Sequence, residues 1–297
     1  MIVGYHNGRD SANPTRRNSK FWYASNGRLK GVPASEAGRR MYSGVEWEVA
    51  MFPSYEIAEA CSDYVDSVLG QYAVCMHDGS LRNGFEIVFD PMTERAFALI
   101  RPLMEQVAAE IERRGGKAHD TQCCGLHVHL SRCAFGNDEH AQMLAFGKML
   151  ELTERFQSAV STIARRDIAT CQWCLPTGYG HALTDGSRAI VRKAKRIQDS
   201  QGLGFHDGRR YRVWNFQNRP TVECRAFKGT LNVGTMFATI AFVNGLARYC
   251  MQHTTPDVHA LTNFNDLIAW IGSEDLTTYW ANVQSRRGSY RMYAAAA

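Results

Sequence analysis

Four short segments of the sequence alternate apolar side chains with residue types that bind cations or phosphate. These segments are residues 44–49, 84–89, 125–131 and 221–226. Because successive side chains of a β-strand point to opposite faces, each segment predicts a strand with one apolar and one chemically active face. The predicted apolar positions are Val45, Trp47, Phe85, Ile87, Leu126, Val128, Val222 and Cys224. The predicted active positions are Glu46, Glu48, Glu86, His127, His129, Glu223 and Arg225.

The active positions indicate a cation site if the four strands are neighbours in one sheet. Four carboxylates on one partly buried face would repel each other strongly unless cations lay among them. Mostly carboxylate oxygen with an imidazole suits magnesium or manganese, whereas structural zinc favours cysteine and histidine. Glu46-x-Glu48 or His127-x-His129 alone more often marks a solvated strand face, where Lys, Thr and Ser would also be expected. The prediction therefore depends on all four segments together.

Helical patterns separate these strands, which is typical of an α/β or α+β domain. Ser54 predicts the N-cap of a helix that ends near Gly70. A second helical region runs over residues 93–114, where Pro102 is expected to kink or split it. Asn137 predicts the cap of a third helix that reaches about Arg166. Further helices are predicted at residues 188–198, 233–252 and 266–270.

The order of the four segments resembles the signature strands of glutamine synthetase and its relatives. Intervening motifs narrow the resemblance to the putative amidoligase family found in phages, plasmids and microbial genomes. They are Asp78-Gly-Ser-Leu, Cys124-Gly-Leu-His-Val-His, Arg212-x-x-Asn215 and Thr221-Val-Glu-x-Arg-x-Phe-Lys-Gly-Thr230. The resemblance covers roughly residues 42–249. It implies an α+β fold whose curved, mainly antiparallel sheet carries helices on its outer face.

The resemblance also implies an ATP-dependent ligase that joins a carboxylate to an amine through an acyl phosphate, with Mg²⁺ or Mn²⁺ as cofactor. Similarity assigns the metal ligands to Glu46, Glu48, Glu86, His127 and Glu223. It places His129 and Ser131 near the nucleotide, and Arg225 with Arg212 at the transferring phosphate, where both arginines also bind nucleotide. Glutamine synthetase supplies two glutamates from its middle region, and here only Glu86 matches, with Asp78 as a candidate substitute.

Two other functions remain open at this stage. A two-metal hydrolase or nuclease would use the same carboxylates and histidines to activate water. A non-catalytic, nucleotide-binding relative would keep the fold without turnover. For the ligase, the substrates are a carboxylate and an amine donor, as a small molecule or on a peptide or protein. The sequence identifies neither substrate, nor the base that deprotonates the amine.

Composition limits the remaining classes of protein. The 297 residues are 45% hydrophobic, carry a formal charge of +5, and include nine cysteines. Length and composition favour a globular chain with a polar N-terminal extension, residues 1–40, and a catalytic domain, residues 41–297. We expect no membrane span, no nucleic-acid binding because Lys and Arg are scattered, and a cytoplasmic location. Cys171-x-x-Cys174 alone is a weak signal for zinc or redox chemistry.

Overall fold

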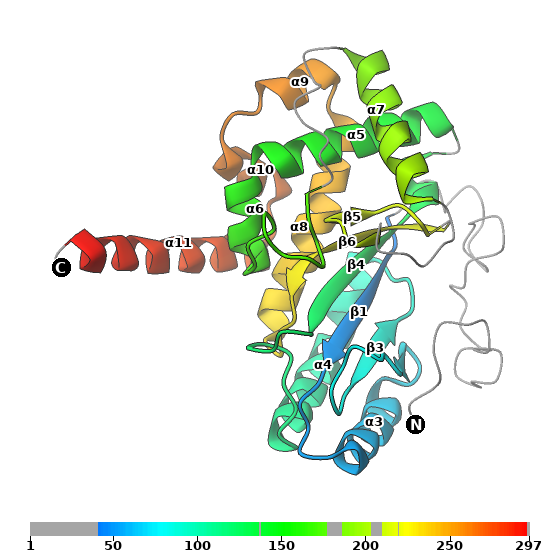
Figure 1. Ribbon diagram of the computed structural model, residues 1–297, viewed down its shortest axis with the longest axis vertical. Coiled ribbons are helices and arrows are strands. Elements are labelled where there is room, and N and C mark those ends of the chain that lie inside the picture. The colour runs from blue at the N-terminus through cyan, green and yellow to red at the C-terminus, as the bar shows by residue number, and fades with distance from the viewer. Residues whose placement is uncertain (1–40, 137, 177–185, 203–209, 219, 296–297) are drawn as a thin grey trace.

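An open antiparallel sheet lies at the centre of the protein (Figure 1). The computed structural model describes residues 41–136, 138–176, 186–202, 210–218 and 220–295. The strands are β1 (Ser43–Val49), β2 (Ala73–Met76), β3 (Phe85–Phe89), β4 (Gly125–Ser131), β5 (Trp214–Asn215) and β6 (Thr221–Lys228). Their order across the sheet is β2-β3-β1-β4-β6-β5. The four predicted strands are therefore adjacent, and the predicted α+β class is confirmed.

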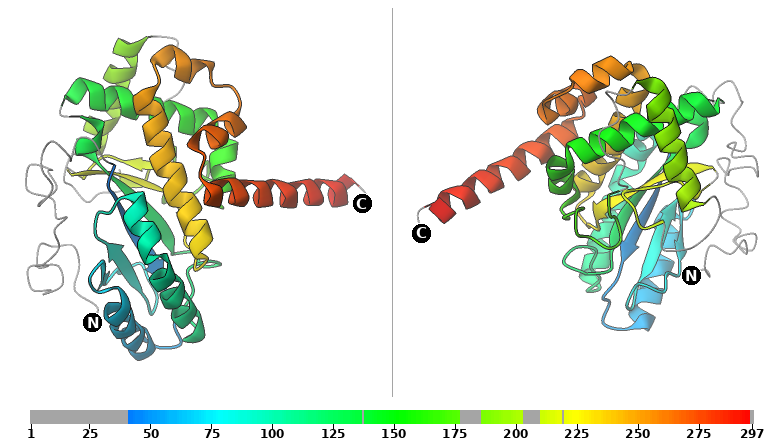
Figure 2. Two further views of the ribbon diagram at one scale, coloured as in Figure 1. Left: turned by 180° about the vertical axis from the view of Figure 1, so that it is seen from behind. Right: turned by 45° about the horizontal axis from the view of Figure 1, so that its top comes forward.

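The apolar face of the sheet packs against three helices, α3 (Tyr55–Leu69), α4 (Glu94–Arg113) and α8 (Val233–Gln252). Seen from behind, α4 and α8 lie across this face (Figure 2). All eight side chains predicted to be apolar here are at most 2% exposed. The Trp47 indole, at the centre, donates from Nε1 to the Thr230 carbonyl, 2.8 Å away. The apolar pattern of the strands thus fixes which face is left for chemistry.

The first two helices begin where the sequence predicts. The Ser54 side chain caps α3 by accepting from the Ile57 amide, and Gly70 follows its last turn. Helix α4 is one element with Pro102 inside it, so the predicted split is wrong. Proline removes only one backbone hydrogen bond, and the buried stripe that includes Phe97 and Met104 holds the helix on the sheet.

The prediction of one long third helix is also wrong, because this segment forms two helices. Helix α5 (Glu139–Arg155) is capped by Asp138, whose side chain accepts from the Ala141 amide. Helix α6 (Gln157–Ala164) follows after a break at Phe156. The Phe156 ring packs edge-on against Phe264 at 5.4 Å, a long-range contact that the local sequence does not reveal. The predicted cap, Asn137, lies outside the described residues.

The remaining helices gather at one end of the sheet, apart from the last (Figure 1). They are the 3₁₀ turn η2 (Arg132–Phe135), α7 (Ser187–Gln201), α9 (Thr255–Ala260), α10 (Phe264–Ile271) and α11 (Glu274–Ala295). Helix α11 extends away from the rest of the described chain (Figure 2). Among the helices of the described residues, none combines the length and apolar character that a bilayer crossing requires. Residues 1–40 lie outside the described residues, so the predicted extension and domain boundary remain predictions.

One irregularity of the sheet lies beside the polar face. Strands β4 and β6 pair Val128 with Cys224 but Leu126 with Phe227. Two residues of β6, Arg225 and Ala226, therefore oppose one residue of β4, which is a β-bulge.

Candidate active site

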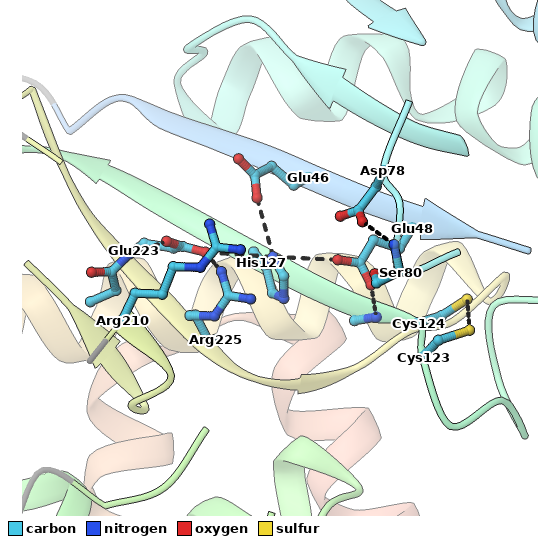
Figure 3. Close-up of polar contacts among 12 residues, drawn as sticks. Glu46, Glu48, Asp78, Ser80, Cys123, Cys124, His127, Arg210, Glu223 and Arg225 are labelled. Atoms are coloured by element: carbon cyan, nitrogen blue, oxygen red, sulfur yellow. Dashed lines mark hydrogen bonds and ion pairs between the residues drawn. The ribbon is translucent and has the colours of Figure 1, made fainter. Parts of the chain in front are cut away.

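Cross-strand pairing brings the predicted polar residues together on the face opposite the helices (Figure 3). The directly opposed pairs are Glu46 with His127, Glu48 with Glu86, and His129 with Glu223. Directly opposed residues share a face and lie within side-chain contact distance. We call these six residues the acidic face. Glu48, Glu86, His127 and Glu223 are each at most 5% exposed, so their charges are largely withdrawn from water.

Three overlapping groups on this face have the composition of cation sites. In each group, ligand atoms from three residues lie within 4.8 Å of one another. The groups are Glu46 with Glu86 and His127, Glu46 with His129 and Glu223, and Glu48 with Asp78 and Glu86. Because the groups share members and extend across four strands and one loop, the arrangement suits more than one hard cation. Carboxylate oxygens dominate, as magnesium and manganese prefer.

Asp78 extends the acidic face beyond the strands. It follows β2 in a turn, where its Oδ1 accepts a hydrogen bond from the Ser80 amide at 2.7 Å. This turn directs the carboxylate toward Glu48 (Figure 3). The sequence had offered Asp78 as a substitute for a second glutamate, and in the structure its carboxylate lies in one group with those of Glu48 and Glu86.

Glu48 is held by the start of β4. The Gly125 amide donates to Glu48 Oε2. A Cβ on Gly125 would lie 2.6 Å from His127 Nε2, so any other residue at this position would displace the His127 ring. Burial raises the pKa of Glu48. His127 and the hydrogen bond from the Gly125 amide lower this pKa, but by less than burial raises it. A buried carboxylate with a raised pKa is a group that a bound cation would stabilise in its charged form.

Both oxygens of Glu223 are held by neighbours on the same face. Arg225 donates from Nη1 to Oε1, and Asn215 donates from Nδ2 to Oε2 at 2.7 Å. Burial alone would raise the pKa of Glu223, but the charges of Arg225 and His129 outweigh it and lower the pKa. The sequence motif included Asn215 without a role, because its strand, β5, has only two residues. Its pairing opposite Glu223 gives it the role of orienting this carboxylate.

His129 lies closer to the acidic residues than its predicted nucleotide role required. Its Nδ1 pairs with Thr221 Oγ1 at 3.1 Å, while Nε2 lies 3.0 Å from Glu46 Oε1. That Nε2 is buried and makes no properly directed hydrogen bond within the described structure. Burial lowers the pKa of His129, but Glu46 and then Glu223 raise it more. An imidazole nitrogen facing two carboxylates fits a cation held among the three groups.

Two guanidinium groups lie at the β6 end of the acidic face. Arg225 Cζ lies 5.7 Å, and Arg210 Cζ 5.1 Å, from the centroid of the Tyr211 ring. Figure 3 shows both side chains beside Glu223 and His127. Burial lowers the pKa of Arg225, but Glu223, Glu46 and Glu48 raise it more, so this group stays cationic. The Arg225 Nε is buried without a hydrogen-bond partner among the described atoms, which leaves one donor for a ligand.

Two predicted residues are not brought to this cluster. Ser131 is fully buried, and its Oγ accepts a hydrogen bond from the Tyr42 amide at 3.3 Å. Arg212 donates from Nη1 to the Pro176 carbonyl at 3.0 Å. Both contacts hold the backbone, and the guanidinium that lies beside Glu223 together with Arg225 is that of Arg210, two residues before Arg212.

A large cleft of the described structure lies away from the acidic face. It has a volume of about 1750 Å³ and is bounded by α4, α6, α8 and the first half of α11, with Arg101, Arg165, Lys228 and Tyr279 in its wall. We call it the α11 cleft. None of the seven polar residues predicted on the strands lines it. Cysteine is likewise absent from the candidate cation groups of the described residues, so the Cys171-x-x-Cys174 zinc hypothesis gains no support.

Comparison with known proteins identifies the family of the chain. A search of curated proteins gives no match. The model of the family described as "putative amidoligase enzyme" matches residues 62–247. This span contains Glu86, both histidines of β4, Glu223 and Arg225, and it covers more than half of the chain. The protein therefore belongs to the putative amidoligase family, a family of ligase-type enzymes.

Proposed function

We propose that the protein is an ATP- and magnesium-dependent ligase that joins a carboxylate to an amine through an acyl phosphate. The observation that carries this proposal is the juxtaposition of three overlapping cation-ligand groups with two guanidinium groups at one end. Carboxylates that hold magnesium beside arginines that hold phosphate are the parts that phosphoryl transfer needs. Family membership supports the ligase class.

The reaction follows from the chemistry of a carboxylate. Its oxygen is a poor leaving group, so an amine cannot displace it directly. In the first step a carboxylate oxygen attacks the γ-phosphorus of ATP, and ADP leaves. In the second step the amine attacks the acyl carbon, phosphate leaves, and the nitrogen loses a proton. Magnesium, when bound, would neutralise the phosphate oxygens.

The residues of the acidic face have distinct tasks in this scheme. Glu46, Glu48, Glu86, His127 and Glu223 would hold the cations, with Asp78 and His129 completing the groups at either end. Asn215 keeps Glu223 oriented through its second oxygen. Arg225 and Arg210 would bind the transferring phosphoryl group, because a guanidinium fork donates two parallel hydrogen bonds to phosphate oxygens.

Calorimetric titration tests the nucleotide and metal dependence. We expect ATP to bind in the presence of magnesium and to lose most of its affinity after complete chelation, because four carboxylates would otherwise face the phosphates. Equal affinity with and without chelator would contradict the shared site. ATP consumption then separates ligase from hydrolase: a ligase turns over ATP in proportion to amide formed, whereas a two-metal hydrolase is active without ATP.

A further inference from the structure

Trp173 is an exposed aromatic side chain close to the acidic face, and neither the fold nor the proposed chemistry accounts for it. Its exposed fraction is 38%, although large aromatic side chains gain stability by burial. Its neighbour Cys174 is fully buried, with Sγ 3.9 Å from the Ala226 carbonyl of β6. The chain is thus anchored to the sheet beside Trp173, while the indole itself stays accessible.

Backbone pairing fixes this segment alongside the arginine-bearing chain. The Leu175 amide donates to the Tyr211 carbonyl at 3.3 Å, and the Val213 amide donates to the Leu175 carbonyl at 2.9 Å. Leu175 and Arg212 form a parallel bridge. Residues 173–175 therefore run beside residues 211–213, which lead into β5 at the same end of the sheet as Glu223.

Tyr211 connects the indole to the guanidinium groups. The Trp173 and Tyr211 rings meet edge to face, with centroids 4.9 Å apart and an interplanar angle of 90°. The same Tyr211 ring carries Arg225 and Arg210 over it. An accessible indole therefore lies one aromatic contact away from two cations that flank the candidate metal groups. A ligand that fits the indole and the two guanidinium groups together has a flat aromatic part joined to an anionic part.

We propose that Trp173 is the surface on which the purine base of ATP stacks, with Tyr211 bracing the indole and the phosphates extending past Arg210 and Arg225 to the acidic face. This inference rests on the proposed function, which supplies the nucleotide. Stacking on an aromatic ring is available to every base through its π-face and is substantial in energy. Cation–π contacts from the arginines hold the Tyr211 ring in place for this role.

The chain offers a matched control in Trp270. Trp270 has the same exposed fraction, 38%, and also meets a tyrosine edge to face, Tyr249, at 5.0 Å and 89°. It lies on α10, and its aromatic neighbours are Tyr249 and His253. A general effect of removing an exposed tryptophan would appear in both variants, whereas loss of a base-stacking surface would appear only at Trp173.

The experiment measures magnesium-dependent binding of ATP and of inorganic tripolyphosphate to full-length wild type, Trp173→Ala, Trp173→Phe and Trp270→Ala. Tripolyphosphate carries the phosphates without a base. We expect Trp173→Ala to weaken ATP binding by about tenfold and to leave tripolyphosphate binding unchanged. Trp173→Phe should retain most of the ATP affinity because it keeps an aromatic face, and Trp270→Ala should bind both ligands as wild type does.

The outcomes separate this inference from the proposed function. Unchanged ATP affinity in Trp173→Ala overturns the stacking surface and leaves the ligase proposal standing. An equal loss of ATP and tripolyphosphate affinity also overturns it, because the indole would then act on the phosphate end or on the fold. If wild type binds neither ligand with magnesium present, the proposed function fails and the inference with it. If the alanine variant does not fold, Trp173→Leu, which keeps an apolar side chain without an aromatic face, should show the same selective loss of ATP affinity, and an unchanged ATP affinity in that variant overturns the stacking surface.

Discussion

The acidic face and the α11 cleft differ in how their charges are balanced. In the cleft, cations are already engaged within the protein: Lys228 lies 3.3 Å from Asp120, and Arg101 lies 3.0 Å from Asp275. Arg165 donates to the carbonyls of Lys228 and Gly229. On the acidic face, carboxylates from three strands and a loop gather around two histidines, and three of them, Glu48, Glu86 and Glu223, are buried. The cations named in the cleft are thus paired with groups of the protein itself, whereas the carboxylates of the acidic face are crowded together.

We therefore assign the proposed chemistry to the acidic face on its unbalanced buried charge, and not to the α11 cleft on its volume. Crowded buried carboxylates cost stability, and a protein keeps them where a ligand offsets the cost. Substitutions in the two regions should therefore have opposite effects. On the acidic face they should remove activity and spare the metal-free fold, and in the cleft they should weaken the fold and spare activity.

The largest effect is expected for Glu46→Ala. Loss of a carboxylate shared by two cation groups should reduce amide formation by on the order of a hundredfold or more. Metal-free stability should change by less than about 1 kcal/mol, because removing one crowded carboxylate also relieves repulsion. Steady-state turnover and a thermal melt in chelator measure the two quantities. Glu139→Ala, at an exposed glutamate paired with Lys195, is the control and should change neither. A large loss of metal-free stability for Glu46→Ala would make this glutamate structural.

Arg225→Lys and Glu223→Gln sharpen the comparison within the acidic face. Lysine keeps the charge but loses the fork, so turnover should fall by on the order of a hundredfold while ATP and magnesium still bind. Glutamine removes a negative ligand, so magnesium should bind more weakly and added magnesium should partly restore turnover. The measurement is turnover against magnesium concentration for both variants. Rescue of the lysine variant but not of the glutamine variant would reverse the two roles.

Arg165→Ala tests the cleft. Its guanidinium holds the carbonyls that follow β6, so its loss should lower the free energy of unfolding by about 2 kcal/mol. Turnover at a temperature where the variant is folded should equal that of wild type. Denaturant unfolding measures the change in stability, and steady-state kinetics measure turnover. Reduced turnover with unchanged stability would mean that the α11 cleft takes part in the reaction.

The smallest effect is expected for Glu110→Gln. Glu110 is a structural carboxylate with a lowered pKa, in contrast to Glu48, whose pKa is raised. Hydrogen bonds from Arg113 and then Arg114 lower the pKa of Glu110 to about 2 from its ordinary value of 4.5. A lowered folded-state pKa means that the stabilisation is present above pH 4.5 and is lost as the pH falls toward 2. The difference in melting temperature between wild type and Glu110→Gln should therefore be present at pH 6 and shrink toward pH 2. A difference that stays constant over this range would show that the ion pairs contribute nothing.

The sequence predicted the strands that carry the chemistry because period-two alternation is a local pattern that one face of a sheet imposes. It predicted α8 for a similar reason, since its apolar residues extend over the whole element. It did not predict β2 or β5, which have four and two residues and are too short to show a period. Helix α11 was also missed, because its polar sequence shows no clear apolar stripe.

Within the candidate site, the sequence named residue types well and partners less well. Glu46, Glu48, Glu86, His127 and Glu223 all lie on the acidic face, as predicted. Arg210 was overlooked in favour of Arg212, although the two are separated by one residue. Which of two nearby guanidinium groups lies beside Glu223 depends on the path of the backbone past Leu175, where a long-range bridge pairs Leu175 with Arg212.

The bulge opposite His127 reverses, in the middle of β6, which of the alternating side chains face the core. Glu223 and Arg225 lie on the side of the acidic face. Beyond the bulge, Phe227 lies on the core side, where the centroid of its ring is 6.2 Å from that of Phe242. In a regular strand made of the same residues, Phe227 would lie on the charged side and Lys228 in the apolar layer, because alternate side chains share a face. The extra residue of the bulge is thus what allows one strand to carry Glu223 and Arg225 on one face and Phe227 on the other, and we expect it to be retained in evolution. Relatives are expected to differ in length in the loops on either side of β6 and to keep the spacing from Glu223 to Phe227 constant.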